Sequence, residues 1–180
     1  MYEFFVLSEL MDEPLSGYKL QFVLQKIVGN SRKISFGVIY PLLDKLAKGG
    51  LIKVRLADTQ LKRKKKIASI TPQGKQRFLE LMQEPIEINQ NTDFMYKIKF
   101  GSFHHVSQAL TLTILYQYQQ YLTNDLRTLR QNKQELSKQG MQPGDLKDTQ
   151  RVFELRELHL LAGLSWTEQQ LREKKNAETK

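Results

Sequence analysis

The chain has 180 residues, of which 40% are hydrophobic and 26% charged, an ordinary balance for a globular protein with its own core. It has no cysteine, which excludes disulfides, thiolate metal sites and cysteine nucleophiles. Its net charge is +9, with 15 Lys and Arg against 8 Asp and Glu in residues 1–84 and 13 against 11 in residues 85–180, so the N-terminal half favours a polyanionic partner such as nucleic acid.

The first ten residues are apolar but short and contain acids. They lack the basic start and small-residue cleavage site of a signal peptide. No apolar run is long enough to span a bilayer. We therefore expect a cytoplasmic protein with no membrane partner.

Three helices are predicted before residue 50. The first carries an apolar stripe over residues 4–11. The second begins at Ser16, a good N-cap, and ends at Gly29. The third begins at Ser35 and ends at Gly49, and its apolar residues fall on one stripe: Val38, Ile39, Leu42, Leu43 and Leu46.

The pattern then changes to the alternation of strands. Residues 51–56 and 66–70 alternate, and turn-like residues 58–60 lie between them. Five consecutive cations, residues 62–66, lie at the tip of this hairpin or in its returning strand. Thr71 and Pro72 are typical of the N-cap and first position of a fourth helix.

The order of three helices, basic hairpin and helix predicts a winged helix-turn-helix. In that fold a recognition helix enters the major groove, and cations on the hairpin lie along the neighbouring phosphates. An isolated basic run is more often a solvated loop. Its position one short strand after a capped helix favours the DNA-binding interpretation.

Four blocks in this half resemble a known family. They are residues 14–20 (PLSGYKL), 35–46 (SFGVIYPLLDKL), 49–52 (GGLI) and 70–75 (ITPQGK). In order and spacing they resemble the PadR family of bacterial transcription regulators, named for the phenolic-acid repressor. The wing departs from the family pattern, because it is rich in Lys where many members carry Arg, and Lys lacks the bidentate fork that suits minor-groove reading.

The resemblance implies a set of DNA-binding residues. The start of the recognition helix would face the DNA, the second helix would contact the backbone, and the wing cations would contact flanking phosphates. Tyr40 and Tyr18 have an alternative interpretation as core tyrosines. With Lys33 and Lys45 on the polar surfaces of the third helix, the set is Tyr18, Lys19, Lys33, Ser35, Gly37, Val38, Tyr40, Lys45, Lys62, Arg63, Lys64 and Lys65.

The C-terminal half predicts two long helices, over about residues 106–138 and 145–174. Apolar residues recur at intervals of seven in both, which is typical of helices that pack against helices. We expect a homodimer that presents two recognition helices to a palindromic operator, although packing on the winged helix of the same chain is an alternative. The predicted dimerisation residues are Leu115, Leu122, Leu129, Phe153 and Leu160.

No catalytic constellation is found, so we expect no enzyme, no cofactor and no metal. His104 and His105 are adjacent and would point in different directions from a helix, and His159 has no second ligand at a suitable spacing. The resemblance implies a small aromatic effector, phenolic acids first. Its candidate contacts have an alternative interpretation as core residues; they are Phe94, Phe103, Tyr116, Phe153 and Trp166.

The predicted fold is therefore mostly α with a small two-stranded β-wing. Residues 1–84 form the winged helix-turn-helix, 85–104 a linker with a short helix, and 105–180 an antiparallel helical dimerisation domain. The predicted function is sequence-specific DNA binding by a transcription regulator, usually a repressor in the family, released by an effector. Two alternatives are a winged-helix protein-interaction module and an RNA or anionic-membrane binder that uses the Lys run.

Overall fold

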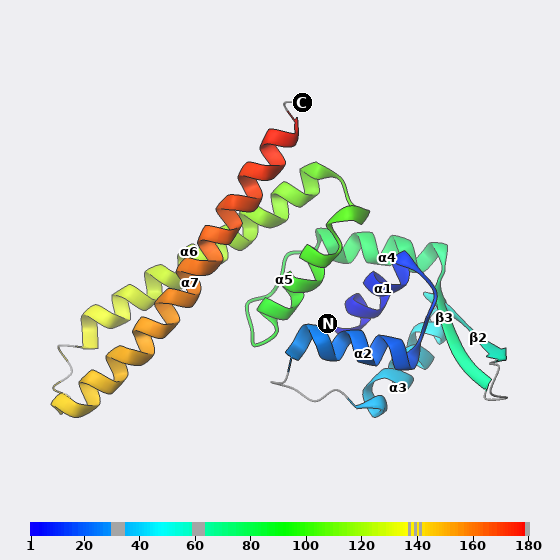
Figure 1. The fold of residues 1–180 in the computed structure, drawn as a ribbon, viewed down its shortest axis with the longest axis horizontal. Coiled ribbons are helices and arrows are strands. Elements are labelled where there is room, and N and C mark those ends of the chain that lie inside the picture. The colour runs from blue at the N-terminus through cyan, green and yellow to red at the C-terminus, as the bar shows by residue number, and fades with distance from the viewer. Residues whose placement is uncertain (30–34, 59–63, 137, 139, 141, 179–180) are drawn as a thin grey trace. The chain divides into compact units, whose positions relative to one another are not determined.

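The computed structural model describes every residue except 30–34, 59–63, 137, 139, 141 and 179–180. The chain divides into two compact units, Met1–Val106 and Ser107–Lys180. Figure 1 shows the elements of each unit. Among the described residues, no helix is long and apolar enough to cross a membrane.

The first unit is a winged helix followed by one further helix and a short turn. The predicted order of its first three helices, hairpin and fourth helix is confirmed. Its elements are α1 (Tyr2–Asp12), β1 (Leu15–Ser16), α2 (Gly17–Val28), α3 (Phe36–Lys48), β2 (Ile52–Asp58), β3 (Lys64–Ile70), α4 (Pro72–Gln83), α5 (Thr92–Gly101) and the 3-10 helix η2 (Phe103–His105).

The core of this unit surrounds α1. Phe4, Phe5, Val6 and Leu7 are fully buried, so successive positions of α1 are covered on all sides. Phe4 packs against Phe78 of α4, with ring centroids 6.0 Å apart. α1 is therefore the central helix of this unit. The elements around it contribute these buried apolar side chains: Leu20, Leu24, Ile39, Leu43, Leu46, Ile52 and Met82.

The sheet has three antiparallel strands in the order β1-β3-β2, and not the two predicted. Leu15 pairs with Ala68, and Ile52 pairs with Ile70 at the other edge of β3. The extra strand forms because Ser16, the N-cap of α2, has extended dihedrals (φ −82°, ψ 155°), as N-cap residues do. Two residues are too few to show an alternating pattern, so the sequence gives no signal for β1.

Both predicted N-caps of this unit, Ser16 and Thr71, are confirmed. The hydroxyl of Ser16 accepts a hydrogen bond from the Lys19 amide at 3.2 Å, and that of Thr71 accepts one from the Gly74 amide at 3.0 Å. The Thr71 hydroxyl also lies 2.7 Å from the carbonyl oxygen of Gly50, and the Thr71 amide donates to the carbonyl of Leu51. Thr71 thus fastens the start of α4 to the start of β2.

Gly74 lies where α4 meets the carbonyl group of Leu51, the residue just before β2. A Cβ at this position would be 2.0 Å from the carbonyl oxygen of Leu51 and 2.8 Å from Cγ1 of Ile70. Only glycine fits this contact. The Thr-x-x-Gly block therefore has a structural role, since its threonine caps α4 and its glycine admits the neighbouring chain.

Lys99 joins α5 to the end of α4. Its side chain is fully buried, and its Nζ donates a hydrogen bond to the carbonyl oxygen of Glu84 at 2.6 Å. Burial lowers the pKa of this amine to about 8, against a smaller opposing effect of the Glu84 carboxylate. The segment after α4 is thus fixed to the winged helix by a buried polar contact.

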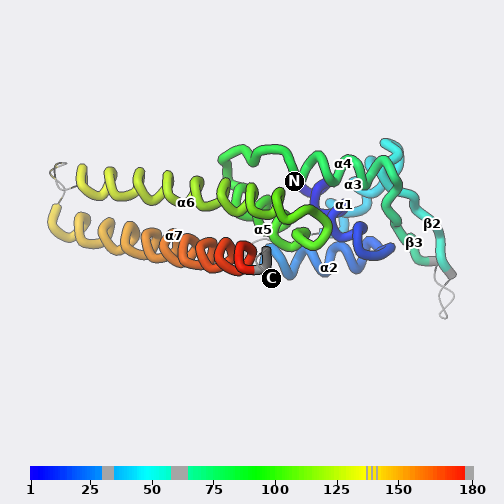
Figure 2. Tube along the Cα trace, turned by 90° about the horizontal axis from the view of Figure 1, so that it is seen from above, coloured from blue at the N-terminus to red at the C-terminus, as the bar shows by residue number. Residues whose placement is uncertain are grey.

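The second unit is a pair of antiparallel helices, α6 (Gln108–Leu136) and α7 (Pro143–Glu178), which lie side by side along their length in Figure 2. Near one end of the pair, the Gln108 side chain donates to the carbonyl oxygen of Lys174 at 2.9 Å. The seam between the helices is built from Leu122, Leu126, Leu129 and Leu160.

Ion pairs flank this seam. Arg130 Nε and Glu157 Oε1 are 2.8 Å apart, and Lys133 binds the other oxygen of the same carboxylate. Hydrogen bonding to Arg130 contributes most to lowering the pKa of Glu157 below its usual value. These contacts join α6 to α7 beside the seam.

Candidate nucleic-acid interface

The approach of α2 to α3 depends on Gly17, the first residue of α2. A Cβ on Gly17 would lie 2.9 Å from Cε1 of Tyr40 and 3.4 Å from Cδ1 of Leu43. The absent side chain lets the Tyr40 ring lie across the start of α2. The glycine of the PLSGYKL block therefore makes room for Tyr40, the tyrosine of the SFGVIYPLLDKL block.

Three aromatic side chains form a row across this junction. The centroids of Tyr18 and Phe36 are 6.1 Å apart and stacked, and Phe36 and Tyr40 are also 6.1 Å apart. Tyr18 is 61% exposed, Phe36 43% and Tyr40 39%, so the row faces solvent. We call these three residues the aromatic row. The core interpretation of Tyr18 is wrong for this structure, and Tyr40 is packed on one side only.

The start of α3 presents small groups beside the aromatic row. Ser35 and Gly37 are exposed and Val38 is half-buried, while Ile39 on the opposite side is buried. Ser35 is the N-cap by position, but its side chain makes no capping hydrogen bond. Small exposed groups at a helix N-terminus allow close approach to another backbone or to base edges.

Both helices that carry the aromatic row also carry exposed cations. Lys19 and Lys26 on α2 are exposed, and their Nζ atoms lie 5.9 and 4.6 Å from the centroid of the exposed Phe22 ring. Lys45 and Lys48 are exposed at the end of α3. The helix pair therefore combines aromatic surface with positive charge.

The wing adds cations on two faces. Strand side chains alternate between faces, so Lys53, Arg55 and Ala57 of β2 share one face. Lys65 of β3 pairs with Ala57 and therefore lies on the same face. Lys53, Arg55 and Lys65 are all exposed. We call these three the wing cations. On the other face, Nζ of Lys66 is 4.0 Å from Oδ1 of Asp44 on α3, an exposed pair of little energetic weight.

Several predicted DNA-binding residues cannot be placed. Lys33, Lys62 and Arg63 lie outside the described residues, and Lys64 is placed only as the first residue of β3.

Six residues of this surface were not predicted from the sequence: Phe22, Lys26, Phe36, Lys48, Lys53 and Arg55. Phe36 falls on the same helical stripe as the core residues Ile39 and Leu43, so its pattern predicts burial, but it is the first residue of α3 and extends beyond the core. The alternation of residues 51–56 already predicted that Lys53 and Arg55 share one face of a strand. Only the run of cations at residues 62–66 was assigned to DNA.

The predicted dimerisation residues are used inside the chain. Leu115 is fully buried, Leu122, Leu129 and Leu160 are buried in the seam of α6 and α7, and Phe153 packs against that seam. The most exposed large apolar residues of α7 are instead Val152 (67%), Leu155 (57%) and Leu158 (63%).

The five aromatic residues predicted for an effector are distributed over both units. In the first unit, Phe94 meets the Tyr2 ring edge-on at 6.4 Å and lines a cavity of about 320 Å³, whereas Phe103 packs on Phe100. In the second unit, the exposed Tyr116 lies under Nζ of Lys175, and Trp166 meets Tyr118 edge-on. Of these five residues, only Phe94 lines the cavity of about 320 Å³.

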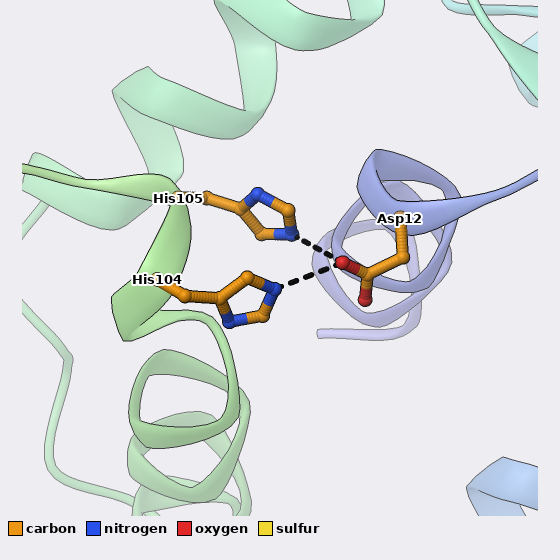
Figure 3. A group of neighbouring side chains, drawn as sticks. All are labelled: Asp12, His104 and His105. Carbon is orange, nitrogen blue, oxygen red and sulfur yellow. Dashed lines mark hydrogen bonds and ion pairs between the residues drawn. The ribbon is translucent and has the colours of Figure 1, made fainter.

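The prediction that His104 and His105 point apart is wrong. They lie in η2, and both rings reach Oδ1 of Asp12, the last residue of α1, with Nε2 distances of 2.8 and 3.0 Å (Figure 3). The hydrogen bond to His104 is the largest cause that lowers the Asp12 pKa. The pKa of His105 is lowered by burial first and by the neighbouring His104 second. A 3-10 turn, which the sequence did not indicate, brings these adjacent rings together.

Comparison with known proteins gives one family match. Residues 6–80 match the family model described as the transcriptional regulator PadR-like family. No curated protein matches the chain.

Several solved structures resemble the chain. A PadR-like transcriptional regulator (BC4206) from Bacillus cereus strain ATCC 14579 is 35% identical over 43% of this chain and 74% of its own, with a TM-score of 0.38. Bacillus subtilis PadR in complex with operator DNA is 23% identical over 96% of this chain and 98% of its own, with a TM-score of 0.45. The same PadR in complex with p-coumaric acid is 21% identical over the same shares, with a TM-score of 0.41.

Proposed function

Because the chain belongs through residues 6–80 to the PadR-like family of transcriptional regulators, we propose that it is a dimeric repressor that binds a palindromic operator. The family match confirms the predicted class, which is not a class of enzymes. The observation that carries the proposal is the exposed aromatic row across α2 and α3, two helices that also carry exposed cations. Exposed aromatic side chains next to cations are costly in water and suit a duplex that presents thymine methyl groups and phosphates.

In this proposal α3 reads the bases. Its first turn enters the major groove, with Ser35 able to bond a base edge and the Phe36 and Tyr40 rings able to contact thymine methyl groups. Gly37 leaves room for the groove floor. Tyr18 and Lys19 at the start of α2 contact the backbone, and Lys45 binds a phosphate.

The wing supplies charge without sequence preference. Lys53, Arg55 and Lys65 lie on one face, and each would neutralise a phosphate and release counterions. Lys33, Lys62, Arg63 and Lys64 add to this charge. The wing therefore contributes affinity that weakens with salt, while α3 contributes preference.

Dimerisation is assigned to the exposed side of α7. Val152, Leu155 and Leu158 are spaced by three residues and project away from the seam, because that seam already buries Leu160 of the same helix. The occupant we propose is α7 of a second copy, since a two-fold pair of recognition helices matches a palindrome.

Leu155→Glu with Leu158→Glu should separate this dimer. Two unpaired carboxylates in an apolar contact weaken association by at least about 100-fold. Light scattering after gel filtration should show about twice the 21.1 kDa chain mass for the wild type and the single-chain mass for the variant. Ile88→Glu, at an exposed apolar residue of the first unit, is the control and should stay dimeric. A double variant that keeps the dimer mass contradicts this interface.

A small aromatic acid is the proposed effector. The cavity lined by Tyr2, Phe94 and Lys97 has about 320 Å³, within the range of ligand sites. It combines aromatic walls with a cation for a carboxylate, although Asp93 also lines it. p-Coumaric acid, which Bacillus subtilis PadR binds in its solved complex, is the first compound to add to a DNA-binding assay. Release of bound duplex supports this effector class, and unchanged binding argues against it.

Selection of genomic fragments by the purified full-length protein tests the proposed function. We expect enrichment of one palindromic site over random fragments. If no fragment is enriched at any salt concentration, the chain is not a sequence-specific regulator, and the protein-interaction alternative takes its place.

A further inference from the structure

A polar cluster lies at the end of α1, apart from the residues assigned to DNA. It consists of Asp12, His104 and His105 (Figure 3). The Asp12 oxygen and one nitrogen from each histidine all lie within 4.8 Å of one another. Among the described residues, this is the one group of three His, Asp or Glu side chains placed to share an ion.

The two rings are held so that their Nε2 atoms face the same point. Their centroids are 3.9 Å apart with an angle of 41° between the rings. Phe78 of the core meets the His105 ring edge-on at 5.8 Å, which fixes that ring against the protein. His105 is only 14% exposed, whereas His104 is 59% exposed. The site thus has one fixed ligand and one that solvent can reach.

Protein contacts leave this cluster incompletely satisfied. Nε2 of His105 is buried and lies 3.0 Å from Oδ1 of Asp12, but it has no hydrogen-bond partner with suitable geometry. The same oxygen already accepts a hydrogen bond from Nε2 of His104 at 2.8 Å. A buried polar atom without an aligned partner is unusual and calls for an ion or water.

A small cavity adjoins the cluster. It has about 40 Å³, enough for water, and its lining includes Glu9, Asp12 and His105 together with Lys97. Glu9 lies one turn before Asp12 on α1, and burial first and the Asp12 charge second raise its pKa. A cation between these carboxylates would relieve their repulsion, against the opposing charge of Lys97 at their side.

We propose that Asp12 Oδ1 and the Nε2 atoms of His104 and His105 bind one divalent transition-metal ion of the class that includes Zn²⁺ and Ni²⁺. Two imidazoles and a carboxylate are ligands that these ions accept, with bonds of about 2.0–2.2 Å. Ligand atoms around such an ion are about 3.3 Å apart, so the present 2.8 and 3.0 Å separations need to open by only a few tenths of an ångström. Water in the cavity completes the coordination.

The ion would join two parts of the first unit that are far apart in sequence. Asp12 is the last residue of α1, the central helix of the winged helix. His105 is the last residue of η2 and comes one residue before Val106, where the first unit ends. Because the site requires both segments in place, binding stabilises the folded unit. This inference stands independently of the proposed DNA-binding function.

Isothermal titration with ZnCl₂ tests the site on full-length protein freed of metal with EDTA. We expect one Zn²⁺ per chain in the wild type. Asp12→Asn and His104→Gln should each lose more than about tenfold in Zn²⁺ affinity, because removing a metal ligand costs at least as much affinity as removing a group that hydrogen-bonds to a ligand. His104 and Asp12 are exposed, so both variants should fold, and circular dichroism checks this. His159→Gln removes the third histidine, which is exposed on α7, and should bind like the wild type.

A second readout reports on the nitrogen atoms themselves. In protein with ¹⁵N-labelled histidine, Zn²⁺ should shift the Nε2 resonances of His104 and His105 and leave those of His159 in place. Equal Zn²⁺ affinity in the wild type, Asp12→Asn and His104→Gln would overturn the proposal. So would loss of the binding in His159→Gln alone.

Discussion

Gly74→Ala is expected to lower the free energy of unfolding of the first unit by about 3 kcal/mol or more, at the upper end of the range for overpacking. The added methyl would lie 2.0 Å from the carbonyl oxygen of Leu51, which is a backbone atom and cannot rotate away. Nor can α4 retreat, because Thr71 holds its first turn to the carbonyl groups of Gly50 and Leu51. The start of α4 must therefore separate from β2, and with it Phe78 from the core.

Urea denaturation followed by circular dichroism measures this loss. Trp166 is the sole tryptophan and lies in the second unit, so its fluorescence separates the two transitions. Gly101→Ala is the control, because a Cβ there meets nothing within 4 Å, and alanine should be neutral or stabilise α5 by up to about 1 kcal/mol. An unchanged midpoint in Gly74→Ala would mean that α4 and β2 are not in contact as described.

Neutralising the three wing cations is expected to reduce DNA affinity at about 0.1 M salt by a few hundred-fold for each bound chain. Each phosphate contact contributes about 0.9 to the slope of log K against log salt concentration, so Lys53→Ala, Arg55→Ala and Lys65→Ala together should reduce the slope by about 2.7 per bound chain. In a dimer that uses both wings, the slope should fall by about twice as much. The loss should be the same on any duplex, because phosphate contacts carry no sequence information.

Fluorescence anisotropy at several salt concentrations gives both the affinity and the slope. The matched control neutralises Arg127, Lys138 and Lys147, which are one arginine and two lysines exposed on the second unit. This control should change the slope little. If the two triple variants behave alike, the wing does not contact the DNA, and the positive charge acts only through the field of the whole chain.

The elements of the first unit were predictable because each has a strong local signal. Ser16 and Thr71 begin helices with side-chain oxygens, and the stripe of Ile39, Leu43 and Leu46 has helical period. These signals depend on neighbours within one turn. The pairing of β1 with β3 joins residues about fifty positions apart, and no local pattern reports it.

The parts that were missed depend on tertiary contacts. The heptad leucines correctly indicate that a helix packs against a helix, but the pattern is the same whether the partner is α7 or a second chain. The helix assumption placed His104 and His105 on different sides, and the 3-10 turn reverses this. Phe36 has the period of a core residue and extends beyond the core because α3 starts there.

The most direct test of the account is the preference of the protein for its selected genomic fragment over a scrambled duplex of the same length, measured by anisotropy for the wild type, Tyr40→Ala and Tyr116→Ala. Tyr116 is 44% exposed on the second unit and matches Tyr40 in exposure. We expect a strong preference in the wild type and in Tyr116→Ala, and a preference at least about tenfold weaker in Tyr40→Ala, with affinity for the scrambled duplex little changed. Equal binding of both duplexes by the wild type at every salt concentration would contradict base reading by α3.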